Sequence, residues 1–352
     1  MKIADPNADS ADIEASKSRS YLRIGGVSLE FTGNSSTFVV PPTLVMFNVG
    51  QTIPNVSVSV EWVRGLHPTQ AKGLFDSGST WKLFELGSHL QFDFYVGMSK
   101  GRPYKRLVTD KRFTVAQLQM SEEANESLGF SAVALDYPLD ELLIMHRLTQ
   151  EKAIELHGTG IVRANGDANL FVGHSGAGKS TTTRLWTDVE DVEVLSDDRI
   201  IVRRDEASVR NPGNVSQSAC ELGVPRLRDC SASPTNLFAQ DDNAAGERSD
   251  QKHKMRMYGT PWHGEAMFAS PNSAPLTRIF VLEHGHGNII TPLTASQAVA
   301  ELFARSFVPF HGHEYVDSAL VFLEELANSV PVYRYSFEPN QQAVDKIRQF
   351  RD

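Results

Sequence analysis

A run of glycines around one lysine and one serine is the most chemically informative feature of the sequence. The pattern G-x-x-x-x-G-K-S is formed by Gly173, His174, Ser175, Gly176, Ala177, Gly178, Lys179 and Ser180. Glycines let the backbone curl until successive N–H groups point inward at phosphate oxygens, and the helix that follows adds its partial positive charge. In such a loop the lysine reaches the β- and γ-phosphates and the serine hydroxyl binds Mg²⁺. The pattern therefore predicts a site for ATP or GTP with Mg²⁺, in which we include the next residue, Thr181.

Two adjacent aspartates, Asp197 and Asp198, end an apolar run that follows the loop lysine. An apolar strand that ends in acids places them at the carboxyl edge of a sheet, where ligands of open α/β sheets bind. Neighbouring residues of an extended backbone point in opposite directions, so the two carboxylates need not share one task. One is expected to hold the metal that bridges the phosphates, and the other to accept the proton of an attacking hydroxyl. In isolation, a turn rich in aspartate would be the simpler interpretation.

The elements expected to position these residues alternate between strand and helix. An apolar run at 168–172 precedes the glycine loop, and a helix at 179–188 follows it. Asn165-Gly166 lies between two apolar runs and predicts a hairpin. Other strands are expected at 153–157, 161–164, 192–196, 278–284 and 331–337, and helices at 140–150, 294–307, 315–328 and 341–350. Thr294 with Gln297 fits a capping box at the start of the helix at 294–307. This alternation predicts an α/β layer architecture for residues 135–352.

The first third of the chain has a different pattern. Short runs rich in β-formers, separated by Gly, Asn, Ser and Pro, occur at 27–31, 36–40, 56–63, 81–86 and 90–97. Gly87-Ser88-His89 predicts a hairpin turn between the last two. Alternating polar and apolar residues in these runs are typical of sheets with one solvated face. They predict a smaller, mostly antiparallel β domain over residues 21–134, after a polar, mobile tail over 1–20. A polar stretch at 229–255 predicts a long surface loop.

Composition excludes several classes of protein. The 352 residues carry a net charge of −9, which argues against a nucleic-acid or anionic-membrane binder. The apolar runs are shorter than the ~18 residues of a membrane span, and the first residues lack the basic and apolar regions of a secretory signal. Two cysteines make no disulfide framework. We therefore expect a cytoplasmic protein that binds neither nucleic acid nor membrane.

Three segments in this order resemble one known family. They are GHSGAGKSTTTRLW, VLSDDRIIV and YGTPWHGE, and they resemble the HPr kinase/phosphorylase family with its phosphoenolpyruvate-carboxykinase-like P-loop fold. The sequence looks closest to the divergent HPr-kinase-like proteins, which include tailoring kinases of lasso peptides. The resemblance implies a kinase that uses ATP or GTP with Mg²⁺ and phosphorylates a hydroxyl, either a serine of a protein or peptide or a small-molecule alcohol. Since that family forms hexamers, homo-oligomerisation stays open.

The resemblance also implies roles for individual residues. Asp197 matches the family's general base, and Asp198 matches its metal-side carboxylate. His157 matches a histidine near the active site, although a partly buried strand histidine is an equal alternative. Glu265 resembles a later acid that supports a metal or orients the substrate. Arg305 resembles a late arginine that reaches the transferring phosphoryl group, and a solvated helix face is the alternative.

Two other functions fit part of this pattern. Small-metabolite kinases of the shikimate or nucleotide-kinase type also carry an aspartate about twenty residues after the loop lysine, although their loops usually lie near the chain start. A non-catalytic nucleotide sensor would need the glycine loop but neither acid. The presence of both Asp197 and Asp198 favours a kinase over a sensor.

Overall fold

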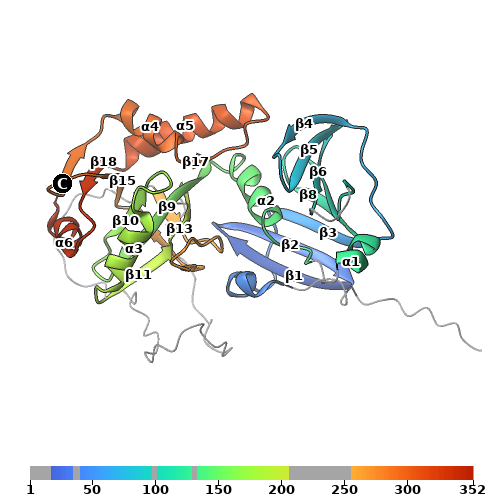
Figure 1. Cartoon of the computed structure of the whole chain (residues 1–352), viewed down its shortest axis with the longest axis horizontal. Helices are drawn as coiled ribbons and strands as arrows, with labels where there is room; N and C mark the ends of the chain where they lie inside the picture. Colours follow the sequence, from blue (N-terminus) through green and yellow to red (C-terminus); the bar gives the residue numbers. More distant parts are fainter. Residues whose placement is uncertain (1–16, 35–39, 97–100, 129–132, 206–254, 352) are drawn as a thin grey trace, which may run out of the picture.

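The computed structural model describes residues 17–34, 40–96, 101–128, 133–205 and 255–351. It shows a mixed α/β protein built on two mixed sheets, one of eight strands and one of ten (Figure 1). Among the helices of this described part, none is both long and apolar enough to cross a membrane. The predicted run at 36–40 and loop at 229–255 lie almost entirely outside the described residues, as does the predicted tail up to residue 16. Residues 17–20 of that expected tail belong instead to the first strand.

The eight-stranded sheet is formed by the N-terminal third. Its strands are β1 (Lys17–Ile24), β2 (Val27–Asn34), β3 (Val56–Val63), β4 (Lys72–Asp76), β5 (Trp81–Leu86), β6 (His89–Phe94), β7 (Lys105–Asp110) and β8 (Val115–Ser121), in the order β1-β2-β3-β8-β7-β6-β5-β4. Strand β3 pairs in parallel with β2 and β8, and the other neighbours pair antiparallel. Two short helices, η1 (Pro42–Phe47) and α1 (Glu122–Leu128), accompany this sheet.

The ten-stranded sheet is formed by the rest of the chain. Its strands are β9 (Ala153–Arg163), β10 (Ala168–Val172), β11 (Val192–Ser196), β12 (Arg199–Arg204), β13 (Met255–Tyr258), β14 (Ser273–Pro275), β15 (Arg278–His284), β16 (Ile289–Pro292), β17 (Ser306–Phe307) and β18 (Val332–Phe337). The main path runs β14-β13-β12-β9-β10-β15-β18-β16, and β11 and β17 pair with β9. Strands β10, β15 and β18 are mutually parallel. The long strand β9 pairs with four of the other strands: β10, β11, β12 and β17.

Helices cover both faces of this second sheet. Helices α4 (Ala295–Phe303) and α5 (His313–Ser329) lie on one face, and α3 (Lys179–Thr187) and α6 (Gln341–Gln349) lie on the other (Figure 1). Successive side chains of β15 point alternately to the two faces of the sheet. Ile279 and Val281 join the core cluster with α4 and α5, whereas Phe280 and Leu282 join the cluster with α3 and α6. The result is the α/β layer arrangement expected from the sequence.

The strongest local predictions are confirmed. Gly166 adopts a φ of +87° in the turn between β9 and β10, where Val162 pairs with Ala168. A second hairpin joins β5 to β6 at Gly87, as expected. The predicted strands at 153–157 and 161–164 form one continuous strand, β9.

The predicted helix at 294–307 is shorter in the structure. Thr294 and Gln297 form a reciprocal capping box at its start, as the sequence indicates. The helix ends at Phe303, because Ser306 and Phe307 pair with β9 instead. Backbone groups that form a sheet ladder cannot also form helical hydrogen bonds.

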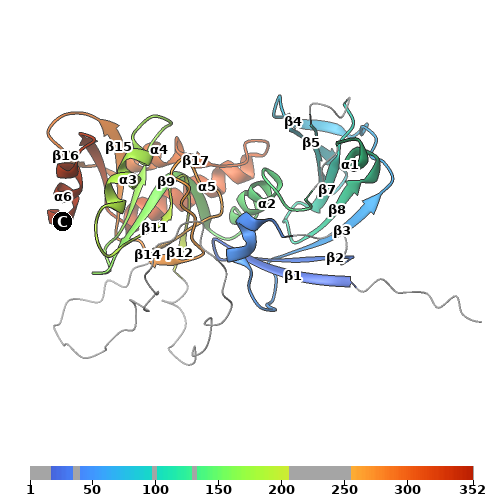
Figure 2. The same ribbon diagram turned by 60° about the horizontal axis from the view of Figure 1, so that its bottom comes forward.

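Helix α2 (Leu139–Leu148) connects the two halves, and both views place it between the sheets (Figure 2). The sequence grouped this helix with the second half. In the structure its apolar residues Leu139, Leu143 and Ile144 lie in the core of the first sheet. Ile201 and Trp262 of the second half join the same cluster. The two halves are therefore in direct contact through α2.

Candidate functional site

The glycine-rich segment connects the buried strand β10 to helix α3, in the predicted context. Gly176 and Gly178 have φ angles of +80° and +98°, a backbone conformation that other residues adopt at a cost. A Cβ atom added to Gly178 would lie 2.4 Å from the Cζ atom of Phe337. His174, Ser175 and Gly176 are exposed at the tip of the loop. Both backbone geometry and packing therefore require glycine at position 178.

Lys179 lies at the start of α3 and folds back over the loop. Its Nζ atom donates to the carbonyl oxygens of Gly173 at 3.0 Å and His174 at 3.1 Å, and only 6% of the residue is exposed. Burial lowers the pKa of Lys179 to about 8; the negative charge of Asp198 opposes this shift, and the positive charges of Arg199 and Arg305 add to it. The negative charge of Asp198 does not fully offset the cost of burying the Lys179 ammonium, so a further anion nearby would stabilise the charged form.

The first turn of α3 presents the predicted hydroxyl groups. Ser180 and Thr181 are both partly exposed there. The helix is fixed to the sheet by buried hydroxyls, since Thr183 Oγ1 donates to Thr159 Oγ1 at 3.0 Å, and Thr159 Oγ1 donates to the carbonyl of Ser196 at 2.8 Å. These bonds join α3 to β9 and to the end of β11, immediately before the two aspartates.

Asp197 is almost completely buried, with 1% of its surface exposed. Its carboxylate accepts hydrogen bonds from the backbone N–H groups of Gly264 at 2.9 Å, Ala266 at 2.7 Å and Phe268 at 3.2 Å. These contacts fix the loop that contains the third motif. A carboxylate so engaged is poorly placed to accept a proton from a substrate, which differs from the general-base role expected for Asp197.

Asp198 is the more accessible of the two acids, with 25% of its side chain exposed. His157 Nε2 donates to its Oδ1 at 2.9 Å, and Arg199 Nη1 donates to its Oδ2. Burial acts to raise the pKa of Asp198, but the hydrogen bond from His157 and the charge of Arg199 outweigh it and hold the pKa below the usual value. Backbone bonds from Gly158 to the Asp198 carbonyl and from Gly173 to the His157 carbonyl join these residues to the glycine loop.

The two remaining predicted residues have opposite outcomes. Arg305 is buried rather than on a solvated helix face, and its Nη1 donates to the carbonyl and the carboxylate of Glu301 at 2.7 Å and 2.6 Å. The backbone N–H of His157 donates to the Arg305 carbonyl at 2.8 Å, and the charge of Arg305 acts on Lys179, so Arg305 belongs to the same group of residues. Glu265 is 84% exposed at the side chain, and its nearest ionic partner is Arg184 of α3 at 3.9 Å. The structure therefore brings Arg305 to the site and leaves the Glu265 carboxylate at the surface.

Three residues of the site were missed from the sequence. Arg199 Nε lies 2.6 Å from Glu141 Oε1 and 3.4 Å from Glu155 Oε1, and its guanidinium stacks over the Phe307 ring at 4.1 Å. Burial and the neighbouring Glu141 raise the pKa of Glu155 well above its ordinary value. A glutamate inside an apolar strand and an arginine directly after two aspartates were the available signals, because a buried charge needs a partner.

Trp262 of the third motif is a packed anchor. Its indole Nε1 donates to Asp140 Oδ2 at 3.0 Å, and 8% of the residue is exposed. Burial raises the pKa of Asp140 to about 6, although the bond from Trp262 opposes the shift. Trp262 therefore fixes the motif to helix α2.

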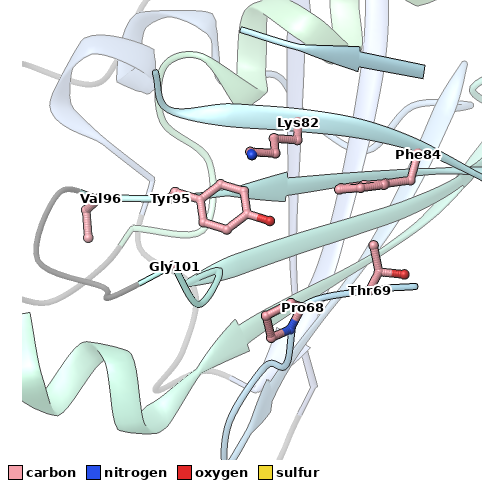
Figure 3. Close-up of a pocket in the computed structure, with 7 residues that line it drawn as sticks. All are labelled: Pro68, Thr69, Lys82, Phe84, Tyr95, Val96 and Gly101. Atoms are coloured by element: carbon pink, nitrogen blue, oxygen red, sulfur yellow. The ribbon is translucent and has the colours of Figure 1, made fainter. Parts of the chain in front are cut away.

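A cavity of about 440 Å³ lies in the first sheet (Figure 3). Its lining includes Lys82, Phe84 and Tyr95 of β5 and the end of β6. Lys82 is paired with Asp76 at 2.9 Å, and burial raises the pKa of Tyr95 to about 12, so its hydroxyl stays neutral. All the residues that line the cavity belong to the first half, so it is separate from the glycine loop.

The donor atoms at the loop suit a metal that arrives with a nucleotide. Within the described ranges, no three His, Cys, Asp or Glu side chains form a group that would hold a metal ion. Mg²⁺ in nucleotide sites is usually bound by one or two protein oxygens together with phosphates and water. A partly exposed hydroxyl such as Ser180, next to a lysine on which the charge of Asp198 acts, fits this second type of site.

No protein-family model matches the sequence, and no curated protein matches it either. The resemblance to HPr kinases therefore depends on the three motifs.

Proposed function

We propose that this protein is a kinase that transfers the γ-phosphoryl group of ATP or GTP to a hydroxyl, either a serine of a protein or peptide or a small-molecule alcohol. The observation that supports this proposal is the convergence of Lys179, Asp198, His157 and Arg305 beside the glycine loop at the end of β10. Phosphoryl transfer requires alignment and charge stabilisation more than covalent chemistry. Two cations and one accessible carboxylate beside such a loop meet that requirement.

Lys179 and Arg305 provide the positive charge. Lys179 binds the β- and γ-phosphate oxygens, and its ammonium regains the stabilisation that burial removes when these anions lie beside it. The buried Nε–H of Arg305 has no hydrogen-bond acceptor among the described residues. A buried donor without an acceptor is unfavourable, so a phosphate oxygen that accepted from it would stabilise the site. Ser180, with the phosphate oxygens, would hold Mg²⁺, which supplies charge neutralisation across the β- and γ-phosphates.

We assign the proton-accepting role to Asp198 in place of Asp197. Both acids accept hydrogen bonds at both oxygens, Asp197 from backbone N–H groups and Asp198 from His157 and Arg199. Asp198 differs in that its side chain is 25% exposed and its charge acts on Lys179, whereas Asp197 is buried. The hydrogen bond from His157 keeps one oxygen of Asp198 oriented. The metal-side role expected for Asp198 stays a prediction.

The test is phosphoryl transfer from γ-labelled ATP with Mg²⁺ to free serine, serine-containing peptides, sugars and small carrier proteins. With an acceptor found, Asp198→Asn should reduce kcat at least ~100-fold, the scale of general-base catalysis, and leave nucleotide affinity within a few fold. Asp197→Asn should chiefly lower the free energy of unfolding, because it weakens three hydrogen bonds of one loop.

Two results would contradict these assignments. Full activity of Asp198→Asn together with an inactive but stably folded Asp197→Asn would return the base role to Asp197. Nucleotide binding without transfer to any acceptor, and without slow hydrolysis, would support a sensor instead of a kinase.

A further inference from the structure

Arg199 opens strand β12 and contacts acids from three elements. Its Nη1 donates to Asp198 Oδ2, and its Nε lies between Glu141 of α2 at 2.6 Å and Glu155 of β9 at 3.4 Å. Phe307 of β17 covers one face of the guanidinium. Burial and the neighbouring Glu141 raise the pKa of Glu155 well above its ordinary value. The carboxylates that accept hydrogen bonds from Arg199 are those of Glu141 and Asp198.

The geometry of a guanidinium makes this arrangement directional. Its planar N–H groups point in fixed directions, so an arginine held at Nε by one acid presents Nη1 in a defined direction to the next. Arg199 thereby fixes Oδ2 of Asp198, while Oδ1 is turned to His157. With both oxygens oriented, the carboxylate has little freedom to rotate.

The anchor of Arg199 belongs to a different part of the molecule from the glycine loop. Glu141 lies on α2, whose neighbouring residues Leu139, Leu142 and Leu143 are buried in the core of the first sheet. The adjacent Asp140 accepts the bond from Trp262. The position of Glu141 is therefore set by the packing of the N-terminal half.

We propose that Arg199, anchored by Glu141 of α2, is a positioning residue that holds the Asp198 carboxylate against His157 beside the glycine loop. This inference rests on the proposed kinase function for its catalytic consequence, but the positioning itself is independent of turnover. The N-terminal half thereby has a role in the proposed active site, because the packing of α2 on the first sheet orients the Asp198 carboxylate in the second half.

The chain offers a matched control pair on the same two parts of the structure. Arg203, also on β12, pairs with Glu151, which follows α2, at 2.9 Å, and both side chains are 9% exposed. Arg203 also donates to the carbonyl of Gly25, so these bonds direct its guanidinium toward the first half rather than toward Asp198. Arg203→Met and Glu151→Gln should therefore show the structural cost of losing a buried ion pair between these elements.

The first measurement uses kinetics in the transfer assay described above. Arg199→Met should lower kcat about 100-fold, the scale of a small misplacement of a catalytic group, with KM for the nucleotide within about two-fold. Glu141→Gln should lower kcat about ten-fold, and Arg199→Lys should recover part of the loss. The two control variants should leave kcat within about two-fold. Equal losses of kcat in Arg199→Met and Arg203→Met would overturn the proposal.

The second measurement does not need turnover. The ¹⁵N signals of the His157 ring, assigned with the His157→Gln variant, report its hydrogen bond to Asp198. They should shift in Arg199→Met and Glu141→Gln and stay unchanged in Arg203→Met. Unchanged His157 signals in folded Arg199→Met overturn the positioning role whatever the activity. Absence of transfer in the wild-type protein, with the shift present, overturns only the kinase function.

Discussion

The two halves of the molecule each bury a lysine, and the two lysines differ in what surrounds them. Lys105 of the first sheet is fully buried and is paired with Asp136, with a further bond to the carbonyl of Ala134. Lys179 of the second half donates to two carbonyls of its own loop, which is exposed at its tip. Burial lowers the pKa of both lysines, but Lys105 has a carboxylate directly beside its ammonium, whereas Lys179 donates to carbonyl oxygens of the loop.

Two aspartates show the same contrast. Asp93 in the first sheet is fully buried, and both of its oxygens accept from Arg106, at 2.6 Å and 2.8 Å. Asp198 in the second half remains 25% exposed and is shared between His157 and Arg199. Buried charge by itself therefore does not identify a site in this protein. What distinguishes the second half is that Lys179 and the partly exposed Asp198 lie beside a loop whose backbone requires glycine.

The largest expected effect comes from exchanging each buried lysine for methionine. Lys179→Met should reduce phosphoryl transfer about 1000-fold, because it removes a charge that acts on the transferring group. Lys105→Met should leave transfer unchanged but lower the free energy of unfolding by about 2 kcal/mol, since it leaves the carboxylate of Asp136 unpaired. Transfer assays and urea unfolding of both variants measure the two effects. A stable, inactive Lys105→Met variant would remove the contrast between the halves.

A smaller effect is expected from two glycines with positive φ. Gly178→Ala should weaken nucleotide binding about ten-fold or more, because a Cβ there meets the Phe337 ring and a φ of +98° is unfavourable for alanine. Gly87 of the first sheet has a φ of +61°, and apart from Gly87 and its two chain neighbours no atom of the described residues lies within 4 Å of the position a Cβ would take. Gly87→Ala therefore costs only the unfavourable backbone conformation. Nucleotide titration by calorimetry measures the first effect and thermal unfolding the second. Equal nucleotide affinity in both variants would show that the loop tolerates a side chain.

The smallest effect concerns His146, which is buried between Phe113 of the first half and His311 of the second. Burial lowers the pKa of His146 to about 3, from an ordinary value of 6.5. Below pH 6.5 the unfolded chain therefore binds a proton that the folded protein does not, so stability falls as pH decreases from 6.5 toward 3. The loss attributable to this residue is about 1.4 kcal/mol per pH unit.

Urea unfolding at several pH values tests the role of His146. The difference in free energy of unfolding between wild type and His146→Leu should change with pH over this window, whereas His89→Gln, at an exposed position, should show no such change. A constant difference between wild type and His146→Leu would contradict neutral burial of the imidazole.

Local patterns in the sequence predicted those parts of the fold that depend on near neighbours. Asn165-Gly166 specifies its hairpin through the backbone freedom of glycine, and Thr294 with Gln297 specifies a helix start through two short-range hydrogen bonds. The end of that helix was wrong, because pairing of Ser306 with β9 competes over a long separation in sequence. The same limit explains why the contact of α2 with the core of the first sheet could not be predicted from local patterns.

The sequence by itself determined which groups are available for chemistry: a glycine loop, its lysine and serine, and two adjacent acids. It did so because the conformational freedom of glycine and the charges of lysine and aspartate are properties of single residues and short spacings. Only the tertiary structure decided that Asp197 binds a backbone loop, that Asp198 faces His157, and that Glu141 of a distant helix holds Arg199. Those contacts join segments far apart in the chain, and burial and hydrogen-bond partners at such distances depend on how the sheets and helices pack.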